Sequence, residues 1–188
     1  MRNAVLVLAL AAAACQSPTE RATPPAPAQT PPARTAVQFL HWYRHQLRAA
    51  DSIPLLDNAT GQRPGQFYRV NFAQTEAYLA LLQHGGYVSA AYLTKWRRYF
   101  RQQDEALRRH PQNEGPPPGF DFDLVTNSQE PSLYLAGASK AQLVTAYPAP
   151  QRALVTATFR VDSTQTNRRL FYLRQYPAGW LIDSIAAN

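Results

Sequence analysis

The last quarter of the chain, Arg152–Asn188, constrains the fold more than any other stretch. It contains three successive runs that favour β-strands: RALVTATFRV, RRLFYLRQY and GWLIDSIA. The polar segment Asp162–Asn167 and the turn Pro177–Gly179 separate these runs, so we expect consecutive hairpins in an antiparallel sheet. Because strands of this length are not stable alone in water, another part of the chain has to cover them.

The covering elements are expected upstream, where the apolar spacing is helical. Thr35–Leu47 places its apolar residues on one helical face, with Thr35 as the N-cap. A second helix is predicted to follow Asn71, because Gln74 stands at the reciprocal capping position, and Phe72 is expected on its apolar side. A third helix is predicted over Ala90–Arg109, with Ser89 as its N-cap. Helices first and sheet afterwards indicate an α+β fold.

Further strands are predicted between the helices and the last quarter. Gln142–Tyr147 is extended, and Pro148–Pro150 interrupts the pattern. The next run, Arg152–Val161, places Ala153, Val155, Ala157, Phe159 and Val161 on one face and Thr156, Thr158 and Arg160 on the other. One face of the resulting sheet is therefore expected to pack on the first helix.

The N-terminus predicts export. Residues 1–14 form a signal peptide with one charge, Arg2, before an unbroken apolar run that is too short to span a bilayer permanently. The run ends at Cys15, the single cysteine of the chain, and AAAC resembles a bacterial lipobox. We expect lipid attachment at Cys15; ordinary signal cleavage that leaves a free thiol is the alternative.

Two further regions follow the signal peptide. Residues 15–34 are predicted to be a lipidated cysteine and a proline-rich stalk, because six prolines and almost no large apolar residue lie in Ser17–Ala33. Residues 35–188 form the folded domain. The formal net charge of +7 would suggest nucleic acid as a partner in the cytosol, but export excludes that partner. We expect a membrane-anchored lipoprotein of the cell envelope, on the periplasmic or outer-membrane face.

The domain also resembles a known fold. The helix opening AVQFLHWY, two further helices and the closing GWLIDSI are similar to the nuclear transport factor 2-like fold. More narrowly, YRVNF at 68–72, YVSAAYL at 87–93 and GFDFD at 119–123 with Gln129 resemble uncharacterised exported bacterial proteins of that fold. The resemblance covers Thr35–Ala186 and implies a curved, cystatin-like sheet around a helix, enclosing a cone-shaped cavity. Relatives use that cavity as an enzyme site, a ligand pocket or a docking surface.

Seven residues are candidates for lining such a cavity: Trp42, Tyr43, Asp121, Asp123, Tyr172, Trp180 and Asp183. The resemblance implies that steroid-isomerising relatives use a pocket aspartate as the base. Asp183 can take such a role only if the strand face that carries Leu181 lines the cavity. If Trp180 lines it instead, Asp183 lies outside. Both faces are apolar, so both alternatives stay open.

Signatures of catalysis and of cofactor binding are absent from the sequence. It contains no G-x-S-x-G, no H-E-x-x-H, no paired C-x-x-C and no glycine-rich phosphate loop. His41 and His45 lie four apart on the first helix, but they fall on its polar face and no carboxylate or cysteine is near them in sequence. We therefore predict no catalytic residue, no metal and no cofactor.

These observations favour a non-enzymatic lipoprotein that binds a small ligand or another envelope protein. Three alternatives stay open. The domain could be an isomerase- or hydrolase-like enzyme that uses Asp183 or the pair Asp121 and Asp123. It could be an envelope immunity-type module that neutralises another protein. It could also form a homodimer through its sheets.

Overall fold

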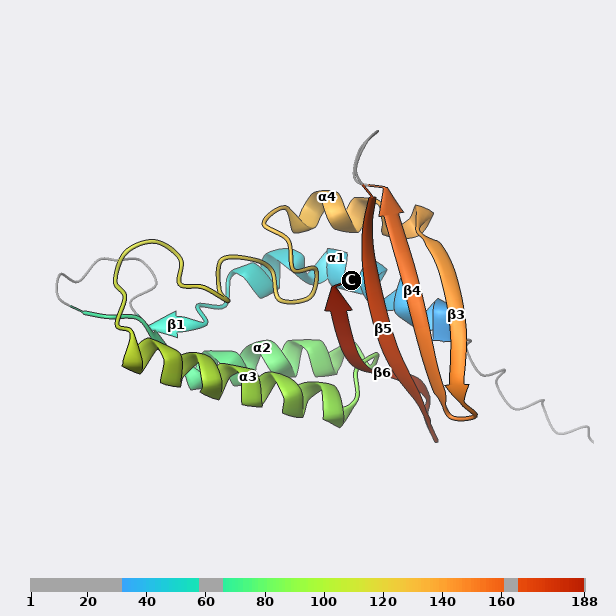
Figure 1. The fold of residues 1–188 in the computed structure, drawn as a ribbon, viewed down its shortest axis with the longest axis horizontal. Coiled ribbons are helices and arrows are strands. Elements are labelled where there is room, and N and C mark those ends of the chain that lie inside the picture. The colour runs from blue at the N-terminus through green and yellow to red at the C-terminus, as the bar shows by residue number, and fades with distance from the viewer. Residues whose placement is uncertain (1–31, 58–65, 161–165, 188) are drawn as a thin grey trace, which may run out of the picture.

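A computed structural model describes residues 32–57, 66–160 and 166–187. The described elements, in chain order, are α1 (Pro32–Asp51), β1 (Leu56–Asp57), β2 (Arg69–Val70), α2 (Phe72–His84), α3 (Ala90–Arg109), α4 (Pro131–Ala136), the 3₁₀ turn η1 (Ala138–Lys140), β3 (Gln142–Ala149), β4 (Arg152–Arg160), β5 (Thr166–Tyr176) and β6 (Gly179–Ala187). Helices are packed on an antiparallel sheet, which confirms the α+β prediction (Figure 1). The predicted signal peptide, Cys15 and residues 15–31 of the stalk lie outside the described residues.

The sheet has the order β3-β4-β5-β6, with each strand antiparallel to its neighbour in the chain. Its inner face follows from the alternation in β4, where Ala153, Val155, Ala157 and Phe159 are all buried. Helix α1 lies across this face and contacts β3, β4 and β6. The short β1–β2 ladder lies at the end of the molecule away from the sheet, and α2 and α3 extend from that end towards β6, which α3 contacts (Figure 1).

The structure shows which face of the last strand, β6, is buried. Ile182 is fully buried and pairs with Leu173 of the inner face, while Trp180 lies two residues before it on the same side. The register then shifts, so that Tyr172 pairs with Ser184 and Asp183 occupies a β-bulge. The inner face is therefore the one that carries Trp180 and Ile182, and Asp183 does not point into the core.

Helices α2 and α3 begin at the N-cap residues that the sequence predicts. The side chain of Asn71 accepts a hydrogen bond from Gln74 N at the start of α2, and that of Ser89 accepts one from Tyr92 N at the start of α3. Both N-caps were predicted. Phe72, by contrast, was expected on the apolar side of α2 and is 44% exposed.

The structure differs from the prediction in several elements. Helix α1 already includes Pro32, so Pro32–Arg34 belong to the domain and not to the stalk, and Thr35 is a buried residue inside the helix. Strand β3 continues through Pro148, which an edge strand tolerates because the missing N–H need not pair. Helix α4 was not predicted, because six residues between loops carry too little periodicity.

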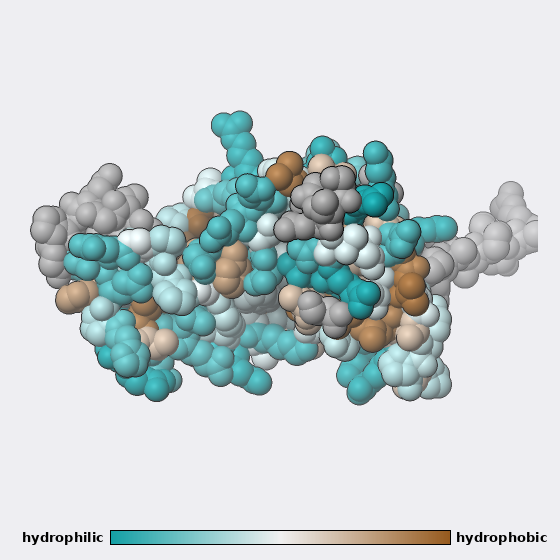
Figure 2. All heavy atoms as spheres, turned by 45° about the horizontal axis from the view of Figure 1, so that its top comes forward, coloured by the Kyte–Doolittle hydropathy of each residue, from teal (hydrophilic) through white to brown (hydrophobic). Residues whose placement is uncertain are grey.

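The described surface is mixed in character. The side shown in Figure 2 is mostly hydrophilic, and its apolar colour is divided into small separate patches. No described helix is both long and apolar enough to cross a membrane.

Candidate functional site

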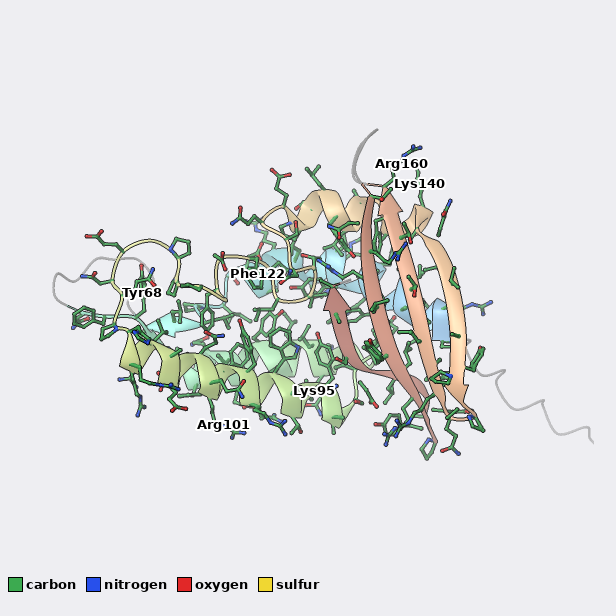
Figure 3. All side chains as sticks on the ribbon, in the orientation of Figure 1. Tyr68, Lys95, Arg101, Phe122, Lys140 and Arg160 are labelled. Carbon is green, nitrogen blue, oxygen red and sulfur yellow. The ribbon has the colours of Figure 1, made fainter. Side chains whose placement is uncertain are left out.

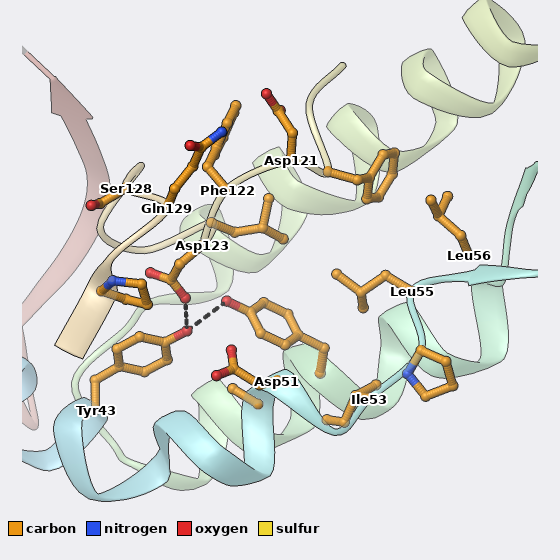
Figure 4. Close-up of a pocket in the computed structure, with 16 residues that line it drawn as sticks. Tyr43, Asp51, Ile53, Leu55, Leu56, Asp121, Phe122, Asp123, Ser128 and Gln129 are labelled. Carbon is orange, nitrogen blue, oxygen red and sulfur yellow. Dashed lines mark hydrogen bonds between the residues drawn. The ribbon is translucent and has the colours of Figure 1, made fainter. Parts of the chain in front are cut away.

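The candidate site is a pocket between the C-terminal half of α1, helix α2, the segment 53–56 and the segment 120–131 (Figure 4). Its volume is about 570 Å³, which is within the range of small-molecule sites. The polar residues of its lining are Tyr43, Asp51, Tyr78, Asp121, Asp123, Ser128 and Gln129. The remaining lining is apolar and includes Ile53, Leu55, Leu56, Phe120, Phe122 and Leu124.

A chain of hydrogen bonds runs through the inner wall of this pocket. The Tyr43 hydroxyl donates to Asp123 Oδ2 at 2.5 Å, and the hydroxyls of Tyr43 and Tyr78 are 3.3 Å apart. Because Tyr43 uses its proton on Asp123, Tyr78 is the donor in the second bond. Helices α1 and α2 are thereby tied to the segment that carries Asp123.

Asp123 also folds its own segment. Its Oδ1 accepts from the backbone N and from Oγ1 of Thr126, both at 2.6 Å. The carbonyl oxygens of Thr126 and Asn127 in turn accept bonds from Nη2 of Arg169, which is 3% exposed on the inner sheet face. Both carboxylate oxygens of Asp123 are therefore already occupied.

The entrance to the segment 120–131 is fixed by Gly119. Its φ is +89°, and a Cβ there would collide with the Tyr99 hydroxyl, which donates to the Gly119 carbonyl at 2.8 Å. The Gly119 N–H donates to Asp121 Oδ1 at 3.1 Å. Asp121 thus braces the turn with one oxygen, and no hydrogen bond to its other oxygen is found within the described chain.

The electrostatics of the pocket keep its phenols neutral. Burial raises the pKa of the Tyr43 phenol far above its ordinary value, and the nearby Tyr78 and Asp123 raise it further. Burial likewise raises the pKa of the Tyr78 phenol, with Asp123 adding to the effect. Partial burial also raises the pKa of the Asp51 carboxyl, and the negative charge of Asp123 adds to that shift.

This arrangement suits binding better than acid–base chemistry. Asp123 already accepts three hydrogen bonds, with at least one on each carboxylate oxygen, and the two tyrosines hold their protons at neutral pH. Within the described residues, no three His, Cys, Asp or Glu side chains are grouped so that they could hold a metal. The charged side chains of the described lining are all aspartates, so a cationic group is the complementary ligand.

The seven residues predicted for a single cavity do not meet in one place. Tyr43, Asp121 and Asp123 line the pocket. Trp42 instead packs near Phe39 and Tyr87, and a Cβ on Gly85 would lie 2.8 Å from its ring. The described pocket therefore contains three of the seven candidate residues.

The remaining three predicted residues are distributed over the sheet. Tyr172 points outward from β5 and is 42% exposed, and the Trp180 ring lies against that of Tyr147. Asp183 Oδ1 accepts bonds from the hydroxyls of Ser89, at 2.6 Å, and Tyr176, at 3.0 Å. Asp183 thus links the bulge of β6 to the start of α3, outside the pocket.

Sequence reasoning missed Asp51 and Tyr78 as pocket residues. Asp51 ends α1 and comes before the apolar run Ile53–Leu56, which forms the facing wall. An acidic residue at a helix end, followed directly by an apolar run, could have indicated the edge of a pocket. Tyr78 carried no such signal, because a tyrosine on an apolar helix face is equally typical of a core.

The comparisons with known proteins identify no family. No family model and no curated protein matches the chain. A solved structure, the crystal structure of the type VI effector–immunity complex Tae3–Tai3 from Ralstonia pickettii, is 17% identical, covers 84% of this chain and 97% of the matched chain, and has a TM-score of 0.44. A similarity of this size does not establish a common fold.

Proposed function

We propose that this protein is a non-enzymatic binding domain which takes up a ligand with a cationic group, such as an amine or a guanidinium, in the pocket at Asp51, Asp121 and Asp123. The observation that carries this proposal is the charge of the lining. The described lining has three carboxylates and no basic residue, although the whole chain has a formal net charge of +7.

The energetics of Asp51 support a cationic ligand. Its carboxylate is partly desolvated and repelled by Asp123, which is why its pKa is raised. A bound cation would relieve both effects, whereas an anion would worsen them. The pocket would then favour positive ligands by attraction and exclude negative ones by repulsion.

The shape of the pocket supports a ligand that is partly apolar. Phe120, Phe122 and Leu55 are among the apolar residues of its wall, and the phenols of Tyr43 and Tyr78 form the inner end. Aromatic faces attract cations, and apolar walls bury the carbon skeleton that carries the charge. An amine on an aromatic or aliphatic frame matches both features.

The predicted setting of the domain remains part of this proposal. We propose that Cys15 is lipidated, that the stalk holds the domain away from the membrane, and that the fold is nuclear transport factor 2-like. Replacement of Cys15 by Ser should then move the protein from the membrane fraction to the soluble fraction. Unchanged fractionation would contradict the lipid anchor.

The enzymatic alternative has less support. Asp123 has no free oxygen to act as a base, and Asp183 is engaged with Ser89 and Tyr176 outside the pocket.

The test is calorimetric titration of the purified chain with benzylamine, 1,5-diaminopentane and arginine methyl ester, and with benzyl alcohol as an uncharged comparison. We expect the amines to bind and the alcohol to bind more weakly. Asp51→Asn should weaken amine binding about tenfold, which corresponds to a loss of about 1.4 kcal/mol.

The matched control is Glu105→Gln, which removes the same charge from an exposed ion pair with Arg109 on α3. It should leave amine binding unchanged. Equal binding of benzylamine and benzyl alcohol, or equal effects of Asp51→Asn and Glu105→Gln, would overturn the proposal.

A further inference from the structure

The face of the sheet that points away from α1 has no helix lying over it. The described helices lie on the inner side, and α3 flanks only the β6 edge (Figure 1). We call this surface the outer sheet face. Its outward residues on β3, β4 and β5 include the apolar Val144, Leu154, Leu170 and Tyr172, the basic Arg152, Arg160, Arg168 and Arg174, and the threonines Thr156 and Thr158 between them.

Four apolar side chains surround Thr156 at the centre of the outer sheet face. Val144 is 67% exposed and Tyr172 is 42% exposed, while Leu154 and Leu170 are half-buried between them and their strand neighbours. Leu154 pairs directly with Tyr172 across β4 and β5. Exposed apolar groups on regular strands contribute little to the stability of the monomer, so their placement is informative.

The margin of the outer sheet face is basic. Arg152 stands directly opposite Arg174 in the β4–β5 register, an arrangement of like charges that destabilises a sheet. Arg160 and Arg168 lie toward the other end of the same two strands, and Figure 3 shows Arg160 together with Lys140 at that end. Among the described residues of β3 to β6, Asp183 is the single acid.

A hollow lies at the end of the basic margin near Arg152. It has a volume of about 530 Å³, and its polar lining is Lys95, Arg152, Tyr172, Arg174, Asp183 and Ser184. Asp183 accepts from the hydroxyls of Ser89 and Tyr176 and lies 3.5 Å from Arg174 Nε. No ion pair to Lys95 or Arg152 is found within the described residues. The hollow therefore has an excess of positive charge beside an exposed tyrosine.

We infer that the outer sheet face is the docking surface for a partner protein that presents carboxylate side chains beside an apolar patch. The opposed pair Arg152 and Arg174 carries the charge argument, because acidic side chains in the hollow would convert a repulsion into two attractions. Arginine and tyrosine at the edge of an apolar centre are also the residues enriched in protein interfaces.

Two other occupants fit the surface less well. A second copy of the chain would bring arginine against arginine, with no acid at a regular position of the described strands to compensate. A bilayer would find few side chains to insert, because Leu154 and Leu170 are half-buried and Val144 and Tyr172 are the exposed large apolar residues of this face. An apolar patch with acidic neighbours on another protein matches both the apolar centre and the basic margin.

The test uses a random peptide library displayed on phage and selected against the purified full-length chain. The selected peptides should be enriched in Asp and Glu next to apolar residues. A synthetic peptide of the enriched sequence should bind the double variant Arg152→Gln, Arg174→Gln about tenfold more weakly than the parent chain. Its affinity should also fall as salt is added.

The matched control is the double variant Arg98→Gln, Arg101→Gln, which removes two exposed charges from α3; Arg101 points away from the rest of the molecule (Figure 3). It should bind the peptide like the parent chain. The inference is overturned if the selected peptides lack acidic enrichment, or if both double variants weaken binding equally.

Two further measurements separate the other occupants. Binding to phosphatidylglycerol vesicles that is lost in Arg152→Gln, Arg174→Gln, without peptide binding, would replace the partner protein with a membrane surface. Concentration-dependent dimerisation in sedimentation experiments that Tyr172→Glu abolishes would replace it with a second copy. Neither outcome depends on the pocket at Asp51, so the two proposals can fail separately.

Discussion

The acidic pocket and the outer sheet face carry opposite charges and are built in opposite ways. In the pocket, Asp123 accepts three hydrogen bonds and thereby folds the segment around it. On the outer sheet face, Arg152 stands opposite Arg174, and the ion pair found for these two arginines within the described residues joins Arg174 Nε to Asp183 at 3.5 Å. The difference separates charges that the fold needs from charges that the fold merely tolerates.

This difference also divides the surface of the molecule into two electrostatic regions. The described lining of the pocket is purely acidic, and the described outward residues of β4 and β5 are purely basic where they are charged. A small cation and an acidic protein would therefore be attracted to different ends of one domain. The net charge of +7 conceals this division.

The largest expected effect concerns the charge that the fold needs. Asp123→Ala removes the acceptor of bonds from Tyr43 and from both the N–H and the hydroxyl of Thr126. We expect the free energy of unfolding to fall by about 3 kcal/mol, measured by urea denaturation. Asp121→Ala, which removes one bond from Gly119, should cost about 1 kcal/mol or less. Equal losses in the free energy of unfolding would mean that the two aspartates contribute equally to the fold.

A smaller effect on stability is expected at Asp51, because desolvation and the charge of Asp123 raise the pKa of its carboxyl. A carboxyl with a raised pKa stabilises the folded state fully only below its unfolded pKa, about 3.9, and this contribution is lost as the pH rises through the folded value. At pH 7, the charged Asp51 therefore opposes folding, and Asp51→Asn should raise the melting temperature.

The check is thermal melting followed by circular dichroism at neutral pH and at a pH below the unfolded pKa of Asp51. The gain from Asp51→Asn should disappear at the acidic pH, since Asp51 is then protonated in both states. Glu105→Gln, which breaks an exposed ion pair, should give no gain at neutral pH. A lower melting temperature for Asp51→Asn at neutral pH would show that the charge of Asp51 does not destabilise the folded state.

The smallest effect is expected on the outer sheet face. The double variant Arg152→Gln, Arg174→Gln should change the free energy of unfolding by no more than about 0.5 kcal/mol, because surface charges of this kind hardly affect stability. Arg69→Gln should destabilise the chain more, since Arg69 bonds Asp104, whose side chain is 6% exposed. A large loss of unfolding free energy in the double variant would mean that Arg152 and Arg174 stabilise the fold.

Much of the architecture could be predicted because it depends on local patterns. The alternation in β4 fixed which of its residues are buried, and the caps at Asn71 and Ser89 fixed where α2 and α3 begin. The inward face of β6 could not be predicted, because both of its faces are apolar. The bulge at Asp183 then changed the register within the strand itself.

The candidate site was predictable only in part. Tyr43, Asp121 and Asp123 were named from the sequence and do lie together, whereas Asp183, Tyr172, Trp42 and Trp180 lie elsewhere. A strand or helix pattern states which side of an element is apolar. It does not state which other element that side will meet.

The sequence by itself determined the α+β class and the antiparallel order of the last strands, because these follow from the periodicity within single elements and from the short turns between them. Only the tertiary structure decided that Asp51, at the end of α1, would face Asp123 across a pocket. It also decided that Lys95 of α3 would join Arg152 and Arg174 in one hollow. Those residues are far apart in the chain, and no local pattern encodes the packing that brings them together.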